Sequence, residues 1–178
     1  TELRQALFTY LKCLAVALLM GGSVACETKS VESIIDRREV RTLVAELQKA
    51  KTCEVYRVDD SYPGENRLNI GKKVHGFLIL SEALPMKDDS RKVLSQILSN
   101  PDTYIEHAVP IDCAFRPGIA FRFSDGTVEV DLLVCFSCNE LRYYLDGKSA
   151  GGSYFKSPEI LALTKKLFPN DKKIQSLK

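Results

Sequence analysis

The segment between Cys113 and Cys138 limits the fold of this chain more than any other part. It contains Asp125-Gly126 between alternating apolar residues, which is the strongest short-range signal for a β-hairpin. If Asp125-Gly126 is a two-residue turn, apolar side chains pair on one face and Arg122 faces Glu129 on the other. The apolar pairs are Phe123 with Val128, Phe121 with Val130, and Ile119 with Leu132. Continued outward, this register places Cys113 opposite Cys138 in a non-hydrogen-bonded pair, where side chains come closest, and so predicts a disulfide between them.

The remaining patterns predict helices around an antiparallel sheet. Helical spacing of apolar residues predicts three helices, over 31–50, from Asp88 or Asp89 to Asn100, and from Pro158 to Pro169. The second of these should bury Val93, Leu94, Ile97 and Leu98. β-Forming residues predict strands over 53–58, 76–81 and 140–145, whereas turn-forming residues predict loops over 59–66 and 146–153. We therefore expect an α+β fold, an antiparallel sheet with a central Asp-Gly hairpin and flanking helices.

The first 25 residues have the layout of a bacterial secretory signal. Arg4 and Lys12 precede an apolar run over 13–20, and small residues then lead up to Cys26. The run is too short to span a membrane comfortably. A buried core helix is the alternative, although it would not explain why the small residues end at a cysteine. The sequence predicts a signal peptide over 1–25, a tether over 26–30 and a single α+β domain over 31–178.

The residues around the expected cleavage site, Ser23-Val24-Ala25-Cys26, resemble the lipobox of bacterial lipoproteins, in which the cysteine is acylated and becomes the mature N-terminus. Val24 and Ala25 fit the pattern, whereas Ser23 stands where an aliphatic residue, usually leucine, is expected. Ser-x-Ala also suits ordinary signal peptidase, which would release a soluble protein. The resemblance implies lipidation of Cys26 and a membrane partner at the cell envelope. A secreted or periplasmic location is the alternative.

Charge and motifs argue against two large classes of function. The formal net charge is +2, and removing Glu2, Arg4 and Lys12 with the signal leaves +1. Basic residues are scattered among acidic ones, without a basic patch interleaved with aromatics, so no nucleic-acid partner is expected. The two histidines, His75 and His107, are more simply structural than catalytic, and no nucleophile-elbow, metalloprotease or phosphate-loop motif is present. We expect no enzyme, and we expect Asp131 to be a solvated charge.

Four cysteines remain after the tether: Cys53, Cys113, Cys135 and Cys138. An even number in an exported protein favours disulfides. Cys53 and Cys135 could form a second pair only if the strand over 53–58 lies beside the hairpin, and the sequence leaves this open.

The run Cys135-Phe-Ser-Cys138 suggests two further kinds of site. A redox dithiol needs its first thiol activated, typically by a helix N-terminus or a nearby cation. Here Cys135 ends a strand, the residues after Cys138 do not predict a helix, and the βαβ context of thioredoxin-like motifs is missing. A structural zinc site would use Cys113, Cys135, Cys138 and His107. Residues three apart in a straight strand point to opposite faces, so zinc requires a turn at 137–139. Covalent haem attachment is excluded because Asn139 stands where a histidine is needed. No cofactor is therefore our first expectation, with zinc as the alternative.

The stretch from Cys113 to Leu145 resembles small secreted or lipid-anchored bacterial proteins without an assigned function, which pair a first cysteine with a later Cys-Phe-x-Cys. This resemblance implies an exported bacterial protein and supplies no catalytic residue. Together with the signal, it favours a non-catalytic lipoprotein with a binding or structural role. The alternative is an envelope thiol-redox or zinc-binding protein that uses Cys113, Cys135 and Cys138.

Overall fold

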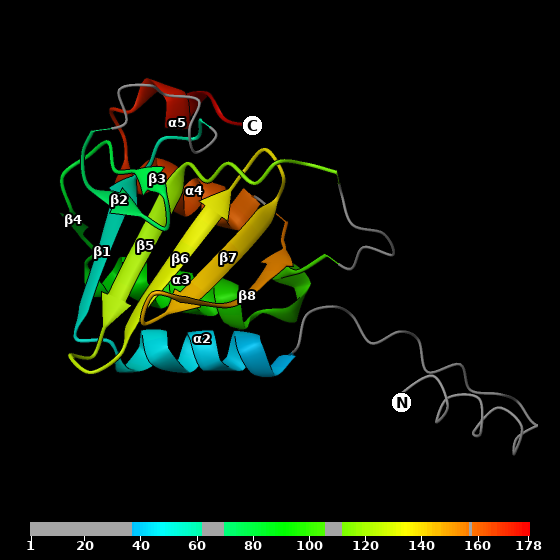
Figure 1. Cartoon of the computed structure of the whole chain (residues 1–178). Coiled ribbons are helices and arrows are strands. Elements are labelled where there is room, and N and C mark those ends of the chain that lie inside the picture. The colour runs from blue at the N-terminus through cyan, green and yellow to red at the C-terminus, as the bar shows by residue number, and fades with distance from the viewer. Residues whose placement is uncertain (1–36, 62–69, 106–111, 157) are drawn as a thin grey trace, which may run out of the picture. The chain divides into compact units, whose positions relative to one another are not determined.

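The computed structural model describes residues 37–61, 70–105, 112–156 and 158–178. Its centre is a six-stranded antiparallel sheet in the order β4-β1-β5-β6-β7-β8 (Figure 1). The strands are β1 (Thr52–Arg57), β4 (Leu84–Pro85), β5 (Ile119–Ser124), β6 (Glu129–Cys135), β7 (Glu140–Leu145) and β8 (Lys148–Tyr154). A separate two-stranded sheet consists of β2 (Lys73–Val74) and β3 (Phe77–Leu78). Helices flank the main sheet, so the predicted α+β fold is confirmed.

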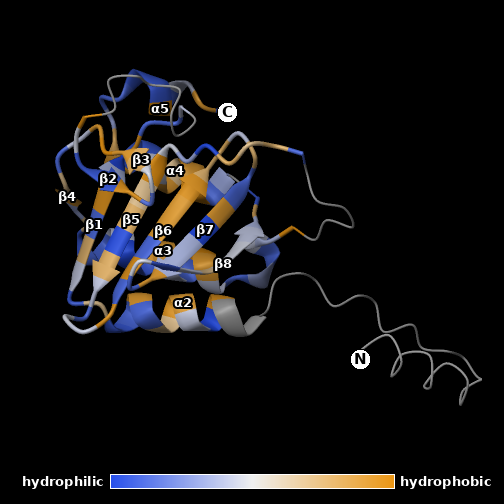
Figure 2. Cartoon of the chain, viewed as in Figure 1, coloured by the Kyte–Doolittle hydropathy of each residue, from blue (hydrophilic) through white to orange (hydrophobic). Residues whose placement is uncertain are grey.

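The helices are α2 (Arg37–Lys49), α3 (Asp88–Ser99), α4 (Pro158–Leu167) and α5 (Lys172–Ser176), with a 3-10 turn over Pro101–Thr103. Helices α2, α3 and α4 contribute buried side chains to the main core on one face of the sheet. Leu43 and Leu47 from α2 meet Leu94 and Leu98 from α3 there, and all four are fully buried. The α2 ribbon shows both hydrophobic and hydrophilic stretches, as expected for a helix that buries one side only (Figure 2). Among the described residues, none of the helices has the length and apolar composition that crossing a bilayer requires.

Helix α3 differs in detail from its prediction. Lys87, rather than an aspartate, is the N-cap residue, and its side chain makes no capping hydrogen bond. Asp88 and Asp89 lie in the first turn instead, where carboxylates interact favourably with the helix dipole. Leu94, Ile97 and Leu98 are buried as predicted, but Val93 is 40% exposed. The helix ends before Asn100-Pro101, as predicted, because a residue before proline disfavours helical backbone.

The central hairpin is present, but its register differs from the predicted one by two residues. Ser124 pairs with Glu129, so the loop contains four residues, 125–128. Asp125 Oδ1 stabilises this loop by accepting hydrogen bonds from the backbone N–H groups of Thr127 (2.8 Å) and Val128 (2.9 Å). A shift of two residues keeps every side chain on its predicted face. It changes the partners, however, and Arg122 faces Asp131 rather than Glu129.

We expect the hairpin loop to make stability depend on acid pH. Hydrogen bonds from the Thr127 hydroxyl and from the Val128 and Thr127 backbone hold the pKa of Asp125 well below its usual range. A carboxyl with a lowered folded-state pKa stabilises the fold above its unfolded pKa of about 4, and this contribution is lost as pH falls. Asp125→Ala should therefore unfold at lower urea concentration at pH 7. The difference from wild type should shrink below about pH 4. A difference that stays constant across this range would contradict the expectation.

Two glycine-containing segments were wrongly predicted. The expected loop over 146–153 is largely strand β8, which follows a tight turn in which Asp146 and Gly147 have φ of 47° and 77°. Gly152 in this strand lies close to strand β7. A Cβ at this position would lie 2.9 Å from the Leu141 carbonyl oxygen, so the two strands can approach this closely only with glycine here. The expected buried strand over 76–81 is shorter: β3 covers Phe77–Leu78, an isolated bridge joins Ile79 to Val58, and Leu80 is 53% exposed.

Helix α4 carries an unusual buried hydroxyl. Thr164 is fully buried, and its Oγ1 has no hydrogen-bond partner among the described residues. Thr103 is also buried, but its hydroxyl donates to the Ile97 carbonyl oxygen over 2.6 Å. Thr164→Val should therefore raise the free energy of unfolding by about 1 kcal/mol, whereas the matched change Thr103→Val should lower it by about 1 kcal/mol. Urea denaturation of both variants checks this, and equal effects of the same sign would contradict it.

Candidate functional site on the second face of the sheet

A second, smaller core covers part of the sheet face opposite α2, α3 and α4. It brings β2, β3 and the segment over 112–118 against strands β1, β5 and β6. In Figure 1, β2 and β3 lie in front of the sheet, whereas α3 and α4 lie behind it. The buried members are Val58, Val74, Phe77, Phe115, Ala120, Leu133, Cys135 and Cys138. The chain therefore has an additional layer on this face, and Cys113, Cys135, Cys138, His75 and Asp131 lie beneath or beside it.

A row of polar side chains crosses the same face where the second core ends. Strand register aligns Glu54 on β1 with Arg122 on β5, Arg122 with Asp131 on β6, and Asp131 with Tyr144 on β7. Side chains alternate along a strand, so these four residues share one face. Next to the row, the Tyr56 hydroxyl donates to Glu54 Oε2 over 2.5 Å. Burial, aided by this hydrogen bond, raises the pKa of Tyr56 to about 12.

Asp131 is the centre of this polar row and is not the solvated charge that we predicted. The residue is 4% exposed. Arg122 donates to it twice, from Nε to Oδ1 over 2.7 Å and from Nη2 to Oδ2 over 2.8 Å. These bonds raise the pKa of Arg122 above its ordinary value. His75 Nε2 also lies 2.8 Å from Asp131 Oδ2. The buried carboxylate is thus compensated by charge-assisted hydrogen bonds, as burial of a charge requires.

His75 connects the β2–β3 hairpin to the sheet. It lies in the tight turn between these strands, where His75 and Gly76 have φ of 47° and 89°. Its ring stacks on Tyr144 with centroids 3.5 Å apart and planes inclined by 10°. The contact with Asp131 favours the tautomer that carries its proton on Nε2. The described contacts join His75 to no hydroxyl or thiol, so the cluster fits a role in holding the hairpin on the sheet.

The predicted disulfide between Cys113 and Cys138 is present, with Cα atoms 5.9 Å apart. The hairpin ladder does not produce it, because β5 begins at Ile119 and Cys138 belongs to the turn over 136–139. The disulfide instead joins the segment over 112–118 to the β6–β7 turn. Both cysteines therefore help to fix the covering layer on the second face.

The other two described cysteines are free and buried, and they lie in different cores. Cys53 belongs to the main core, where its Sγ lies 3.4 Å from Met86 Sδ, and burial raises the pKa of Cys53 to about 12. Cys135 belongs to the second core, where its Sγ lies 3.4 Å from the Arg116 backbone nitrogen. Strand β1 does lie near the hairpin, as a Cys53–Cys135 pair would need. The two side chains nevertheless belong to opposite faces, so no second disulfide forms.

The residues of the alternative zinc site are only partly brought together. The turn after β6 does place Cys135 and Cys138 in one core, as zinc would need. The disulfide, however, joins the Cys113 and Cys138 sulfurs to each other, and His107 lies outside the described residues. Within the described ranges, histidine, cysteine and carboxylate side chains form no group of three or more suited to a metal ion.

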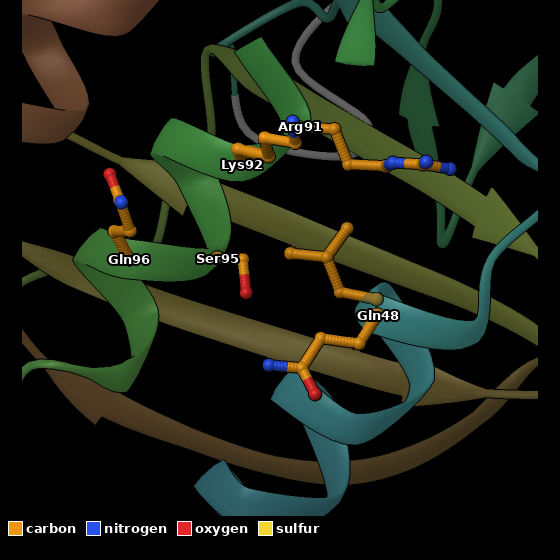
Figure 3. Close-up of a pocket in the computed structure, with 6 residues that line it drawn as sticks. Gln48, Arg91, Lys92, Ser95 and Gln96 are labelled. Atoms are coloured by element: carbon orange, nitrogen blue, oxygen red, sulfur yellow. The ribbon is translucent and has the colours of Figure 1, made fainter. Parts of the chain in front are cut away.

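A shallow hollow of about 350 Å³ lies between α2 and α3 (Figure 3). It is lined by Leu47, Gln48, Arg91, Lys92, Ser95 and Gln96. Arg91 is the strongest donor among them, but it contacts the Ala50 carbonyl oxygen over 2.5 Å and the Asp88 carboxylate over 3.0 Å. The lining includes no carboxylate, histidine or thiol, and its polar groups are the cations of Arg91 and Lys92, two amides and one hydroxyl.

Comparison of the chain with protein-family models, curated proteins and solved structures finds no match. The resemblance of the stretch from Cys113 to Leu145 to small exported bacterial proteins therefore stays a prediction. The signal segment and Cys26 lie outside the described residues, so lipidation also stays a prediction.

Proposed function

We propose that this chain is an exported bacterial lipoprotein with a non-catalytic, binding or structural role at the cell envelope. In this proposal, acylated Cys26 anchors the α+β domain to the membrane. The observation that carries it is the disulfide between Cys113 and Cys138, because disulfides form and persist in oxidising compartments outside the cytosol. The signal-like layout over 1–25 supplies the route to such a compartment.

The polar row supports a structural role for its residues over a catalytic one. Acid–base catalysis on a nucleophile needs a hydroxyl or thiol within hydrogen-bond reach of the base. The described contacts of His75 are with Asp131 and Tyr144, and Asp131 is also bound by Arg122. These contacts hold the β2–β3 hairpin in place, which favours a rigid module over an enzyme.

The anchor is tested on protein isolated from bacterial membranes by intact mass measurement and detergent-phase partitioning. Wild type should carry acyl chains on Cys26 and enter the detergent phase, whereas Cys26→Ser should do neither. Cys13→Ser is the matched control, because Cys13 lies in the segment expected to be removed, and it should behave as wild type. Ser23→Leu should increase the acylated fraction by completing the lipobox. A wild-type protein that stays in the aqueous phase with an unmodified Cys26 would overturn the anchor.

One observation favours a second candidate function, that of a thiol protein. Cys135 is a free thiol in the same small core as the Cys113–Cys138 disulfide. A free thiol beside a disulfide is the arrangement from which thiol–disulfide exchange proceeds.

A further inference from the structure

Three of the cysteine sulfurs gather at one end of the second face of the sheet. Cys135 is the last residue of β6, and the turn over 136–139 brings Cys138 back into the same buried core. The Ser137 hydroxyl oxygen lies 3.2 Å from Cys135 Sγ and 4.0 Å from Cys138 Sγ. The free sulfur and one disulfide sulfur therefore contact the same hydroxyl group.

Cys135 also has the hydrogen bonds that an attacking sulfur needs. The Arg116 backbone N–H donates to Cys135 Sγ over 3.4 Å, and the Ser137 hydroxyl can donate to it as well. A thiolate, rather than a thiol, attacks a disulfide, and such donors compensate its negative charge when the sulfur is buried. Cys53 provides a contrast, because its closest described polar contact is the thioether of Met86.

We propose that Cys135 exchanges with the disulfide inside the folded protein and so makes Cys113 a reactive thiol. The Cys135 thiolate attacks Cys138 Sγ, which forms a Cys135–Cys138 bond and breaks the Cys113–Cys138 bond. The electron pair of the broken bond leaves on Cys113 Sγ, which takes up the proton that Cys135 released. The step consumes no oxidant or reductant, because one disulfide and one thiol are present before and after it.

The product is geometrically reasonable and changes which sulfur meets solvent. Residues three apart in a turn have Cα atoms within about 7 Å, which overlaps the range that disulfides span. Cys135 is fully buried and Cys138 is 5% exposed, whereas Cys113 is more exposed than either. Exchange would therefore move the free thiol from the interior to the surface. The exchange requires the disulfide and the Cys135 thiol, and it does not require the lipid anchor.

Peptide mapping of the wild-type protein tests the exchange without any substitution. The oxidised full-length protein is held at about pH 8.5, the ordinary pKa of a thiol, then quenched in acid, alkylated without reductant and digested with trypsin. Cleavage after Lys92, Arg122 and Arg142 places Cys113 on one peptide and both Cys135 and Cys138 on the next. Exchange predicts alkylated Cys113 together with a 123–142 peptide that contains an internal disulfide. A map in which Cys113 and Cys138 always stay linked would overturn the proposal.

Two variants measure the part played by each free thiol. In Cys135→Ala, alkylation of Cys113 in the native, unreduced protein should be at least about tenfold slower than in wild type, because the attacking thiol is missing. Cys53→Ala is the matched control, since it also removes a buried free thiol, and it should alkylate at the wild-type rate. Circular dichroism shows whether each variant is folded. Equal alkylation of Cys113 in both variants would overturn the role of Cys135, and if Cys135→Ala does not fold, the wild-type map decides.

Discussion

Replacing Asp131 by asparagine should lower the free energy of unfolding by about 3 kcal/mol, at the low end of what breaking a buried ion pair costs. The carboxylate is buried and holds two Arg122 nitrogens and His75 Nε2, each within 2.8 Å. Asparagine keeps the size of the side chain but removes the charge that these donors compensate. Arg122 retains 34% side-chain exposure, so water recovers part of the loss. Urea denaturation at neutral pH measures the change.

Glu129→Gln is the matched control for Asp131→Asn. Glu129 is not the cross-strand partner of Arg122, but its Oε1 lies 3.4 Å from Arg122 Nη2, and its side chain is 46% exposed. Exposed ion pairs contribute between 0 and about 1 kcal/mol, so this variant should differ little from wild type. Equal losses from the two substitutions would mean that Asp131 is not the centre of the polar row.

The second large effect is expected at Arg57, whose side chain is 7% exposed at the end of β1. Its guanidinium donates to the carbonyl oxygens of Val58 and Gly118 and lies 3.3 Å from Asp171, the N-cap residue of α5. Arg57→Ala removes these contacts and the packing of the alkyl chain, and it should cost about 3 kcal/mol. Amide hydrogen exchange should also show that α5 loses protection before the rest of the fold.

Lys173→Ala separates this effect from the loss of any charge near α5. Lys173 pairs with Asp60 over 2.5 Å, but its side chain is 59% exposed, and such pairs contribute little. The variant should keep the stability of wild type and the protection of α5. If Lys173→Ala destabilises the protein as much as Arg57→Ala, the buried guanidinium is not what holds α5.

Local patterns in the sequence predicted the elements with strong periodicity. Strand β7 has its predicted bounds, and the buried positions Leu94, Ile97 and Leu98 of α3 were identified from their spacing. The hairpin was found from Asp125-Gly126, but its loop length depends on side-chain hydrogen bonds of Asp125 that dipeptide statistics do not contain. Gly152 of β8 was misread as part of a loop because its need for space arises from the neighbouring strand.

The candidate site was less predictable than the fold. Residues His75 and Asp131 are 56 positions apart, and their contact depends on a two-residue strand pair and on the observed hairpin register. The dipeptide His75-Gly76 was a local sequence signal for a turn, since glycine favours the left-handed backbone that both residues adopt in the structure. The disulfide was predicted because two cysteines flank one hairpin, although the register used for it was wrong.

Two of the connections that hold the covering layer on the second face differ in their chemistry. The Cys113–Cys138 bond is covalent and can be reduced, whereas the His75–Asp131 contact is a hydrogen bond. Neither connection involves the main core beneath α2, α3 and α4, whose members form a separate cluster. Reducing agents should therefore loosen the covering layer while leaving the helical side folded. We therefore expect the two faces of the sheet to differ in their response to reducing agents, because the disulfide lies on one face only.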